Sequence, residues 1–433
     1  MKAASHDVPH VVWHWGTLGP YHFARMRALA AHSGAFRLSV LETRDRDNHS
    51  WNRPDRDPAF SLCTLEDGSA HVIKGGSFLG ERMVEALRRL RPDIIVTTGY
   101  HDPIAHAAYA RYRSANPAAK LVLWSESTEH DSVRSALRES LKRVVAARHS
   151  GALTSAEIHA EYLRKLGFAP GSISIVGGDC VDNDYFSRSA RASLLPPQAR
   201  PATGLPERYF LYVGRLAPEK NLFRLLDAYR QYRILSEMPH PVELVLVGHG
   251  PDGAALESEI KSSGIEGVTL AGTKQIDELP RYYANSECLI LPSIQEPWGL
   301  VVNEAMACGR PALVSRRCGC AAEVIVEGVT GFTFDPLDTA ALARTMYKLS
   351  RAPDLDRMGK EAAARIGRFS LERFAASTSE YLVRLHTLPT PNPTKVQLLG
   401  QRCFNFLWRF ADRLVLRPNA PREIDRIDLI GQP

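Results

Sequence analysis

Short apolar runs alternate with amphipathic stretches along almost the whole of this 433-residue chain, and this alternation constrains the fold more than any other feature. Short apolar runs bounded by turn-forming residues are typical of buried strands, and helical periodicity marks the stretches between them. Strands that alternate with helices predict α/β units with parallel sheets. Expected strands in the first half include His10–Trp15, Asp93–Thr98 and Leu121–Trp124.

The alternation breaks once, at residues 188–206, where Pro, Ala, Ser and Arg dominate and periodicity is lost. Such a composition is typical of linkers. We therefore predict a first doubly wound, Rossmann-like domain at residues 1–187 and a second at 207–370, with 188–206 as the linker between them. A helix and an amphipathic extension are expected in residues 371–433. A length about three times the ~150 residues of a typical domain agrees with this division.

The charge pattern and the C-terminal extension raise the question of a membrane surface. Most of the net charge of +6 lies in residues 1–200, which fits either an anionic membrane surface or solvated helix faces. Residues 396–416 place apolar side chains on one helical face with arginines beside it, which predicts either a packed helix or an amphipathic element on a membrane.

Localisation is predicted from three further features. No apolar run approaches the ~18 residues that a transmembrane helix needs, and the first ten residues lack the apolar stretch of a secretory signal. Seven unevenly spaced cysteines fit a reducing compartment better than a disulfide framework. We expect a cytoplasmic protein, with peripheral contact at the inner face of the plasma membrane as an alternative.

The stretch Cys288–Gly309 is the strongest candidate for a functional site. An apolar strand ends there, a polar loop follows, and a helix is expected to begin near Pro297 or Trp298, because proline is favoured at the first helical position. Free amides at such an N-terminus would suit a phosphate. Glu296 and Glu304 are eight residues apart, so they would fall roughly on one side if both were helical.

This stretch resembles the Glu-x7-Glu segment of retaining glycosyltransferases with the GT-B fold, in the large family 4 group (glycosyl transferases group 1). The family pattern Glu-Pro-aromatic-Gly-Leu-x-x-x-Glu-Ala-Met-Ala-x-Gly is matched by residues 296–309, with Trp298 as the aromatic residue. The resemblance implies that Glu296 orients the donor sugar as a catalytic residue and that Glu304 holds the ribose. It also places three residues of the expected helix start at the donor diphosphate, namely Gly299, Leu300 and Val301.

Residues 210–221 (FLYVGRLAPEKN) are similar to a second family segment, in which an Arg and a Lys bind the donor diphosphate. The resemblance therefore assigns Arg215 and Lys220, next to Gly214, to the leaving group. A guanidinium offers phosphate a bidentate fork and an ammonium adds a point charge. Together they could neutralise a leaving diphosphate without a metal. The family segment that contacts the donor base corresponds to the loop with Thr273 and Lys274.

The turn Gly248–Gly253 reads Gly-x-Gly-x-x-Gly, so a dinucleotide site must be considered. Such a site needs an acid at the end of the next strand, about 20 residues on. The strand Val268–Leu270 runs into Ala271–Thr273 without one, which disfavours NAD. The turn is also similar to a family feature that is chiefly structural.

The N-terminal half matches the family more weakly, as expected for the half that binds the acceptor. Gly16 opens a loop that stands where relatives carry a Gly-rich loop at the donor phosphate, and glycine lets amides approach an anion. The strand Leu121–Trp124 ends where many relatives carry an active-site His. Glu126, Ser125 or His101 could take its place on the acceptor side, and each is equally plausible as a solvated loop residue.

Two patterns could suggest metals. Metal-dependent GT-A transferases hold a divalent ion with Asp-x-Asp triplets, and this chain has triplets at 45–47, 55–57 and 182–184. The first two lie in the polar stretch Thr43–Pro58 and not at the end of an apolar strand, and we interpret all three as loop acids. Cys308, Cys318 and Cys320 are close together but lack a second pair or a His at zinc-finger spacing. We predict no metal and no cofactor.

The predicted fold is α/β, of GT-B type, with two Rossmann-like domains facing across a cleft and a C-terminal helix, Leu371–Tyr381, crossing back. The predicted function is retaining transfer of a hexose-type sugar from a UDP- or GDP-linked donor to a hydroxyl of a sugar or lipid-linked acceptor, in polysaccharide or glycolipid synthesis. The alternatives are a GT-B sugar-nucleotide epimerase and a non-catalytic nucleotide-sugar-binding protein. No nucleic-acid partner is expected, because no such motif is present.

Overall fold

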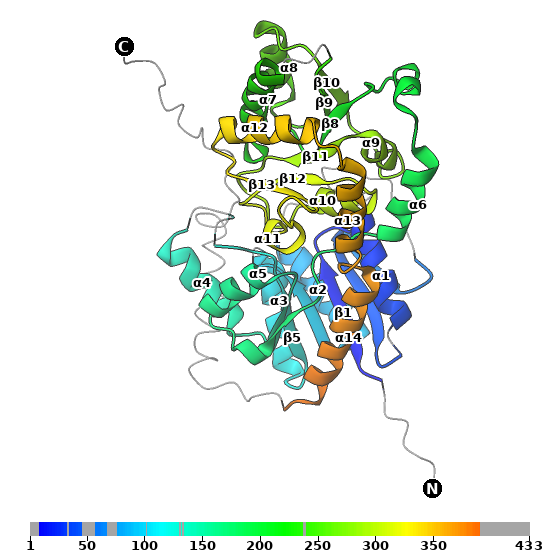
Figure 1. Cartoon of the computed structure of the whole chain (residues 1–433). Coiled ribbons are helices and arrows are strands. Elements are labelled where there is room, and N and C mark those ends of the chain that lie inside the picture. The colour runs from blue at the N-terminus through cyan, green and yellow to red at the C-terminus, as the bar shows by residue number, and fades with distance from the viewer. Residues whose placement is uncertain are drawn as a thin grey trace.

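Two parallel sheets, each flanked by helices, form the body of the molecule (Figure 1). The computed structural model describes residues 8–32, 34–45, 57–66, 76–100, 102–129, 131, 134–236 and 240–389. Within these ranges the N-terminal sheet has the strand order β3-β2-β1-β4-β5-β6-β7 and the C-terminal sheet the order β10-β9-β8-β11-β12-β13. Both orders reverse direction beside their first strand, as in doubly wound nucleotide-binding folds. The predicted α/β fold class is confirmed.

The N-terminal domain buries its strands from both sides. Its strands are β1 (His10–Trp15), β2 (Arg37–Arg44), β3 (Ser61–Glu66), β4 (Ile94–Thr98), β5 (Lys120–Trp124), β6 (Gly151–Thr154) and β7 (Ile173–Ile175). Its helices are α1 (Pro20–His32), α2 (Gly76–Leu90), α3 (Pro103–Ala115), α4 (Ala136–Ala146) and α5 (Glu157–Lys165). Successive residues of β1 alternate between two cores, because Trp13 packs in one apolar cluster and Val12 in another on the opposite face.

The C-terminal domain repeats this plan. Its strands are β8 (Tyr209–Val213), β9 (Glu243–Val247), β10 (Val268–Gly272), β11 (Cys288–Leu291), β12 (Ala312–Ser315) and β13 (Gly331–Phe334). Its helices are α6 (Asn183–Ser193), α7 (Leu222–Ser236), α8 (Gly253–Ser262), α9 (Leu279–Asn285), α10 (Leu300–Ala307), α11 (Ala321–Val324), α12 (Thr339–Ser350) and α13 (Leu355–Ile366). The last described helix of the chain is α14 (Leu371–Thr387).

The region expected to be an irregular linker, 188–206, is partly helical. Helix α6 continues through Ser193 and packs against α9 and α10 of the C-terminal domain. Asp182 accepts a hydrogen bond from Tyr185 N at 2.8 Å and so caps this helix. The apolar face of α6, with Phe186 and Ala190 buried, is short and interrupted by polar residues, which is why periodicity alone did not indicate it.

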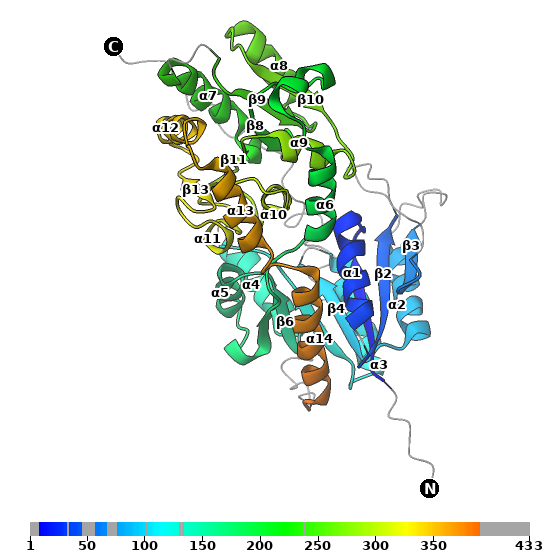
Figure 2. The same cartoon turned by 45° about the vertical axis from the view of Figure 1, so that its right-hand side comes forward.

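Helix α14 crosses back to the N-terminal domain, as the family resemblance implied, and lies beside α1 (Figure 2). Phe374 is fully buried there, with its ring 6.1 Å from that of Trp13 and 5.9 Å from that of Trp124. The buried Lys120 at the start of β5 donates to the His386 carbonyl at 2.9 Å and to two neighbouring carbonyls. A lysine at the carbonyl end of a helix is favourable, so this contact anchors the end of α14.

The chain passes between the domains twice, and the two passages touch. Asn183 Nδ2 donates to the carbonyls of Ile366 and Phe369 at 3.2 and 3.0 Å. Beside them Gly178 has a φ of +87°, and a Cβ there would collide with the Phe369 ring. This close approach explains why a glycine stands at the first passage.

We therefore expect Gly178→Ala to destabilise the protein by about 3 kcal/mol, because it combines left-handed backbone strain with overpacking at the junction. Gly171→Ala is the matched control, since a Cβ there meets nothing within 4 Å. Urea unfolding followed by circular dichroism compares the two variants. Equal stability of both variants would show that the close approach of Gly178 to Phe369 does not require a glycine.

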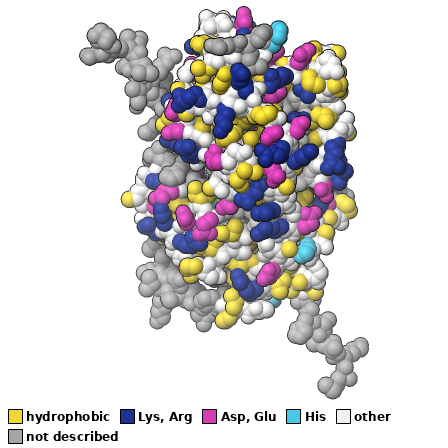
Figure 3. All heavy atoms as spheres, in the orientation of Figure 1, with side chains coloured by type: hydrophobic (Ala, Val, Ile, Leu, Met, Phe, Trp, Pro, Cys, Tyr) yellow, Lys and Arg dark blue, Asp and Glu magenta, His cyan; other side chains and the backbone are white. Residues whose placement is uncertain are grey.

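The expectations about a membrane surface concern residues that the structure describes only in part. Residues 396–416 lie there, so both interpretations of that segment stay predictions. None of the helices in the described ranges is long and apolar enough to cross a bilayer. On the face shown in Figure 3, basic and acidic side chains are interspersed over both domains.

Candidate functional site

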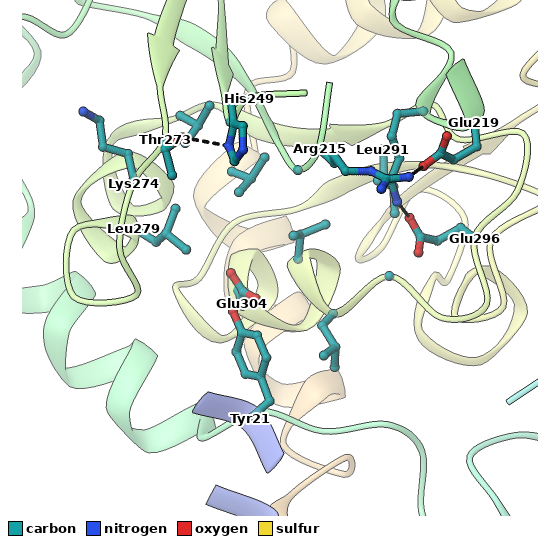
Figure 4. Close-up of a pocket in the computed structure, with 18 residues that line it drawn as sticks. Tyr21, Arg215, Glu219, His249, Thr273, Lys274, Leu279, Leu291, Glu296 and Glu304 are labelled. Carbon is teal, nitrogen blue, oxygen red and sulfur yellow. Dashed lines mark hydrogen bonds and ion pairs between the residues drawn. The ribbon is translucent and has the colours of Figure 1, made fainter. Parts of the chain in front are cut away.

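A pocket of about 390 Å³ lies where the carboxyl ends of β8, β9 and β11 meet the start of α10 (Figure 4). Loops that follow adjacent parallel strands converge at this edge of the sheet, which is where doubly wound folds bind ligands. All the donor-side residues predicted in the C-terminal domain line the pocket, namely Gly214, Arg215, Lys220, Thr273, Lys274, Glu296, Gly299, Leu300, Val301 and Glu304. The N-terminal domain contributes Tyr21 to the same wall.

Two cations stand on one side of the pocket, and each is paired with a carboxylate. Arg215 follows β8 directly, and its half-exposed guanidinium lies 2.5 Å from Glu219. Lys220 ends the short 3₁₀ turn Pro218–Lys220 and donates to Glu296 Oε2. The Lys220 and Glu296 side chains are largely buried, with 17% and 13% of their surfaces exposed. The pocket therefore holds one exposed and one enclosed ion pair.

The loop that carries Glu296 corrects the predicted helix start. Neither Pro297 nor Trp298 is helical, because α10 begins at Leu300 after Gly299, whose φ is +106°. A Cβ at Gly299 would lie 2.7 Å from Leu291 Cδ2, so the turn needs glycine there. The backbone of Glu296 instead forms an isolated parallel β-bridge with that of Cys318. Glu296 and Glu304 thus reach the pocket from a loop and a helix, and a shared helical face plays no part.

The first turn of α10 forms part of the pocket wall. Leu300 and Val301 are the first two helical residues after Gly299, and both line the pocket. Amides at these positions have no partner within a helix. The N-terminus of a helix favours negative charge. This wall and the two cations together suit an anion.

Glu304 lies on the opposite side and is almost completely buried. Its Oε1 accepts a hydrogen bond from the Tyr21 hydroxyl at 2.8 Å, and its Oε2 accepts one from the Tyr283 hydroxyl at 2.6 Å. Burial raises the pKa of Glu304 to about 7, although both tyrosine hydrogen bonds lower it. The carboxyl group therefore titrates near neutral pH, at the boundary between the two domains.

The far end of the pocket is formed by the loops after β9 and β10. His249 Nδ1 lies 2.9 Å from Thr273 Oγ1, and the Lys274 ammonium sits 5.7 Å from the centre of the Tyr282 ring. Gly248 has a φ of +140°, and a Cβ on it would collide with the Gly214 carbonyl. The glycine pattern of this turn thus allows the loops after β8 and β9 to pack closely, in agreement with the structural interpretation.

Two candidates from the N-terminal half, Gly16 and Glu126, are not among the described residues that line this pocket. Gly16 is exposed, and its carbonyl accepts the Arg44 amide at 3.0 Å, so its contact with a donor stays a prediction. Glu126 lies after β5 and accepts a hydrogen bond from the Ser155 hydroxyl. His101 falls outside the described residues.

Beside Glu126 lies a buried acidic group that the sequence did not indicate. Asp179 is paired with Arg25, and both side chains are buried. Burial raises the pKa of Asp179 to about 8; Arg25 lowers it, and the neighbouring Glu126 raises it further. The Asp179 carbonyl accepts a hydrogen bond from Asn303 Nδ2 at 2.8 Å. This cluster ties the N-terminal domain to α10.

Two acids of the Asp-x-Asp triplets, Asp57 and Asp182, have local structural partners. Asp182 caps α6, and Asn183 bridges the two passages between the domains. Asp57 accepts hydrogen bonds from Arg27 Nε at 2.5 Å and from Ala59 N at 2.9 Å. Cys308, Cys318 and Cys320 are buried free thiols, as expected for small core residues.

Motif reasoning missed three polar residues of the pocket. Glu219 and His249 lie within quoted segments, and their position after β8 and β9 was a usable signal. Tyr21 is 283 positions from Glu304, so no local pattern could pair them.

Comparisons with known proteins bear on this site. Residues 198–365 match the family model described as Glycosyl transferases group 1. Similar curated proteins include alpha-D-kanosaminyltransferase of Streptomyces kanamyceticus, 31% identical over 42% of this chain and 45% of its own length. D-inositol 3-phosphate glycosyltransferase of Mycobacterium sp. (strain KMS) is 31% identical over 58% of this chain and 54% of its own. The chain thus spans about half the length of these relatives.

Solved structures resemble the whole fold. Sucrose-phosphate synthase from Thermosynechococcus elongatus superposes with a TM-score of 0.67 at 20% identity, over 87% of this chain and 99% of that one. Anabaena HepE in complex with UDP superposes with a TM-score of 0.66 at 18% identity, over 86% and 99%. These likenesses show the two-domain GT-B fold.

Proposed function

We propose that this chain, whose residues 198–365 form a domain of the glycosyl transferases group 1 family, is a retaining glycosyltransferase that uses a nucleoside-diphosphate sugar. The observation that carries the proposal is the pocket at the carboxyl edge of the second sheet, which Arg215, Lys220 and the first turn of α10 line together with Glu296 and Glu304. An anion, a ribose and a sugar each find suitable groups there. The UDP complex of the similar Anabaena protein favours a donor of this class.

The diphosphate is assigned to Arg215, Lys220 and the amides of Leu300 and Val301. Charge grows on the leaving diphosphate as the glycosidic bond breaks, and preorganised cations and amides stabilise that charge. Lys220 is held by Glu296 in the structure, so it is already positioned before a donor arrives. Side chains that need no reordering cost less on binding.

Glu304 is assigned to the ribose and Glu296 to the sugar. A carboxylate oxygen can accept more than one hydrogen bond, so Glu304 can accept ribose hydroxyls while the tyrosines hold it. Glu296 contacts Lys220 and therefore lies next to the proposed diphosphate position. An oxocarbenium-like transition state is expected for the sugar, as in glycosyl transfer generally.

The acceptor is assigned to the N-terminal domain, where Glu126 follows β5 at the edge that faces the second domain. Loop residues on a rigid sheet are a common place for recognition. We propose a hydroxyl acceptor on a sugar or a lipid-linked sugar, as in polysaccharide or glycolipid synthesis. The buried free thiols of the described residues favour a reducing compartment such as the cytoplasm. Peripheral membrane contact stays an alternative prediction.

Slow donor hydrolysis tests this function without knowledge of the acceptor. Mass spectrometry follows UDP-, GDP-, ADP- and dTDP-linked hexoses with the protein, with and without EDTA. We expect cleavage of one donor at a rate that EDTA changes less than twofold, because Arg215 and Lys220 replace a metal at the leaving group. Loss of cleavage with EDTA would contradict the metal-free site. If no donor is cleaved and none binds in calorimetry, the proposed function is contradicted.

A further inference from the structure

The wall of the pocket has one residue that comes from the other domain. Tyr21 lies in the first turn of α1, directly after the loop that follows β1, and it packs against the core of the C-terminal domain. In Figure 4 its side chain rises from α1 towards Glu304. Its hydroxyl reaches Glu304 Oε1 at 2.8 Å. A residue of the N-terminal domain therefore takes part in the geometry of the donor site.

We propose that Tyr21 is a positioning residue of the donor site, whose hydroxyl holds Glu304 oriented and ionised for the ribose. This inference rests on the proposed function, in which Glu304 binds the ribose. Tyr283 does the same for Oε2 from α9, at 2.6 Å. With one hydroxyl donor on each oxygen, the carboxylate is fixed in one plane and keeps lone pairs for a diol.

A second contact shows that α1 is held where this role requires. Arg25 is one turn after Tyr21 on α1, and its Nε donates to the Cys180 carbonyl at 3.1 Å. The Asp179 carbonyl in turn accepts from Asn303, the residue before Glu304 on α10. Two successive residues of α10 are thus bound to the N-terminal half. The orientation of Glu304 depends on how closely the two domains approach each other.

The ionisable surroundings give this role a pH signature. The groups that face Glu304 are Tyr21 from α1, Tyr283 from α9 and Cys308, which caps the end of α10. Tyr185 of α6 and Arg25 of α1 face Tyr21. Burial raises the Glu304 pKa to about 7, and each tyrosine donor lowers it. Removing the Tyr21 hydroxyl therefore raises this pKa further. Less carboxylate is then available at neutral pH, and more of it returns as the pH increases.

The test measures calorimetric affinity for UDP and GDP between pH 7 and 9, with inorganic pyrophosphate as the ligand that lacks ribose. For Tyr21→Phe we expect affinity for the nucleoside diphosphate to fall about tenfold at pH 7, since a hydrogen bond to a charged group is lost. The difference in affinity between Tyr21→Phe and the wild-type protein should become smaller towards pH 9. Pyrophosphate should bind both proteins with the same affinity. Tyr283→Phe should behave in the same way. Tyr185→Phe, the matched control, should follow the wild-type protein.

The outcomes separate this inference from the function on which it rests. If UDP or GDP binds and Tyr21→Phe matches the wild-type affinity at every pH, the role of Tyr21 is wrong and the donor site stands. If Tyr21→Phe loses pyrophosphate as strongly as the nucleoside diphosphate, Tyr21 only maintains the fold, and the inference is again wrong. If the wild-type chain binds neither UDP nor GDP, the proposed UDP- or GDP-linked donor site itself is overturned, and the inference with it.

Discussion

Glu296→Gln is expected to lower donor turnover about 10³-fold while leaving the affinity for the nucleoside diphosphate within threefold of the wild-type value. The loss has the size expected for one charged group that acts mainly in the transition state. Glutamine keeps the size of the side chain. The loop itself is held by its backbone, since the Glu296 carbonyl accepts the Gly319 amide at 3.0 Å. Lys220 loses its ion pair with Glu296 in this variant and is free to pair with the diphosphate, which offsets its looser positioning.

Glu219→Gln is the matched control for this variant. Glu219 also pairs with a cation of the pocket, but the Arg215 guanidinium in that pair is half exposed. Exposed ion pairs contribute at most about 1 kcal/mol, so turnover should change less than about fivefold. Hydrolysis rates and diphosphate calorimetry for both variants use the donor found in the panel. Unchanged turnover in Glu296→Gln would remove Glu296 from the proposed mechanism.

The same pair of variants addresses the competing interpretation as a binding protein. A non-catalytic protein would bind the diphosphate in all three forms and cleave no donor in any of them. Measurable cleavage by the wild-type chain that is lost in Glu296→Gln would exclude the interpretation as a binding protein. An epimerase would convert the donor sugar without releasing the diphosphate, which the same mass spectra distinguish by product.

The C-terminal half of the site could be predicted because its residues follow strands. Arg215, Lys220 and Glu296 are close in space for the reason that β8 and β11 are neighbours in a parallel sheet, so their carboxyl ends meet. A residue type placed after an apolar run therefore indicates its position at the sheet edge. In the other domain, the strand β1 was predicted with the bounds that the structure has, His10–Trp15.

Other features depended on contacts that no local pattern records. The helix start at Leu300 follows from the left-handed conformation of Gly299, which overrode the preference of Pro297 for a first helical position. The edge strand β3 was missed, since its short sequence SLCTLE mixes apolar residues with small and polar ones. Tyr21 was missed as a partner of Glu304 because the two domains bring them together.

The second large effect expected is a steep loss of stability in mild acid. His14 and His106 are buried in the N-terminal domain, where His14 Nε2 lies 2.9 Å from Thr43 Oγ1 and His106 Nε2 lies 3.1 Å from the Gly99 carbonyl. Burial lowers the pKa of each to about 4. Burial also lowers the pKa of two further histidines to about 3, namely His22 and His149.

The sign of the effect follows from proton counts. Below the ordinary histidine pKa of 6.5 the unfolded chain protonates these rings and the folded protein does not. The contribution of the histidines to the free energy of unfolding is therefore complete above about pH 6.5 and is lost as the pH falls towards 4. Each ring contributes up to about 1.4 kcal/mol per pH unit. Asp179 and Glu304 act in the opposite direction, because their raised pKa values make the folded protein bind protons first.

These four histidines and two carboxyl groups alone give a difference of about two protons between the unfolded and folded protein near pH 5, or about 3 kcal/mol per pH unit. This is a large share of the roughly 5–15 kcal/mol by which domains are stable. Urea unfolding at pH 7, 6, 5.5 and 5 measures the slope. His106→Gln should reduce this slope by the equivalent of about one proton, even though the variant is less stable at pH 7. His32→Gln, at the exposed end of α1, should leave the slope unchanged. A pH-independent unfolding midpoint would show that these rings are already charged or accessible in the folded protein.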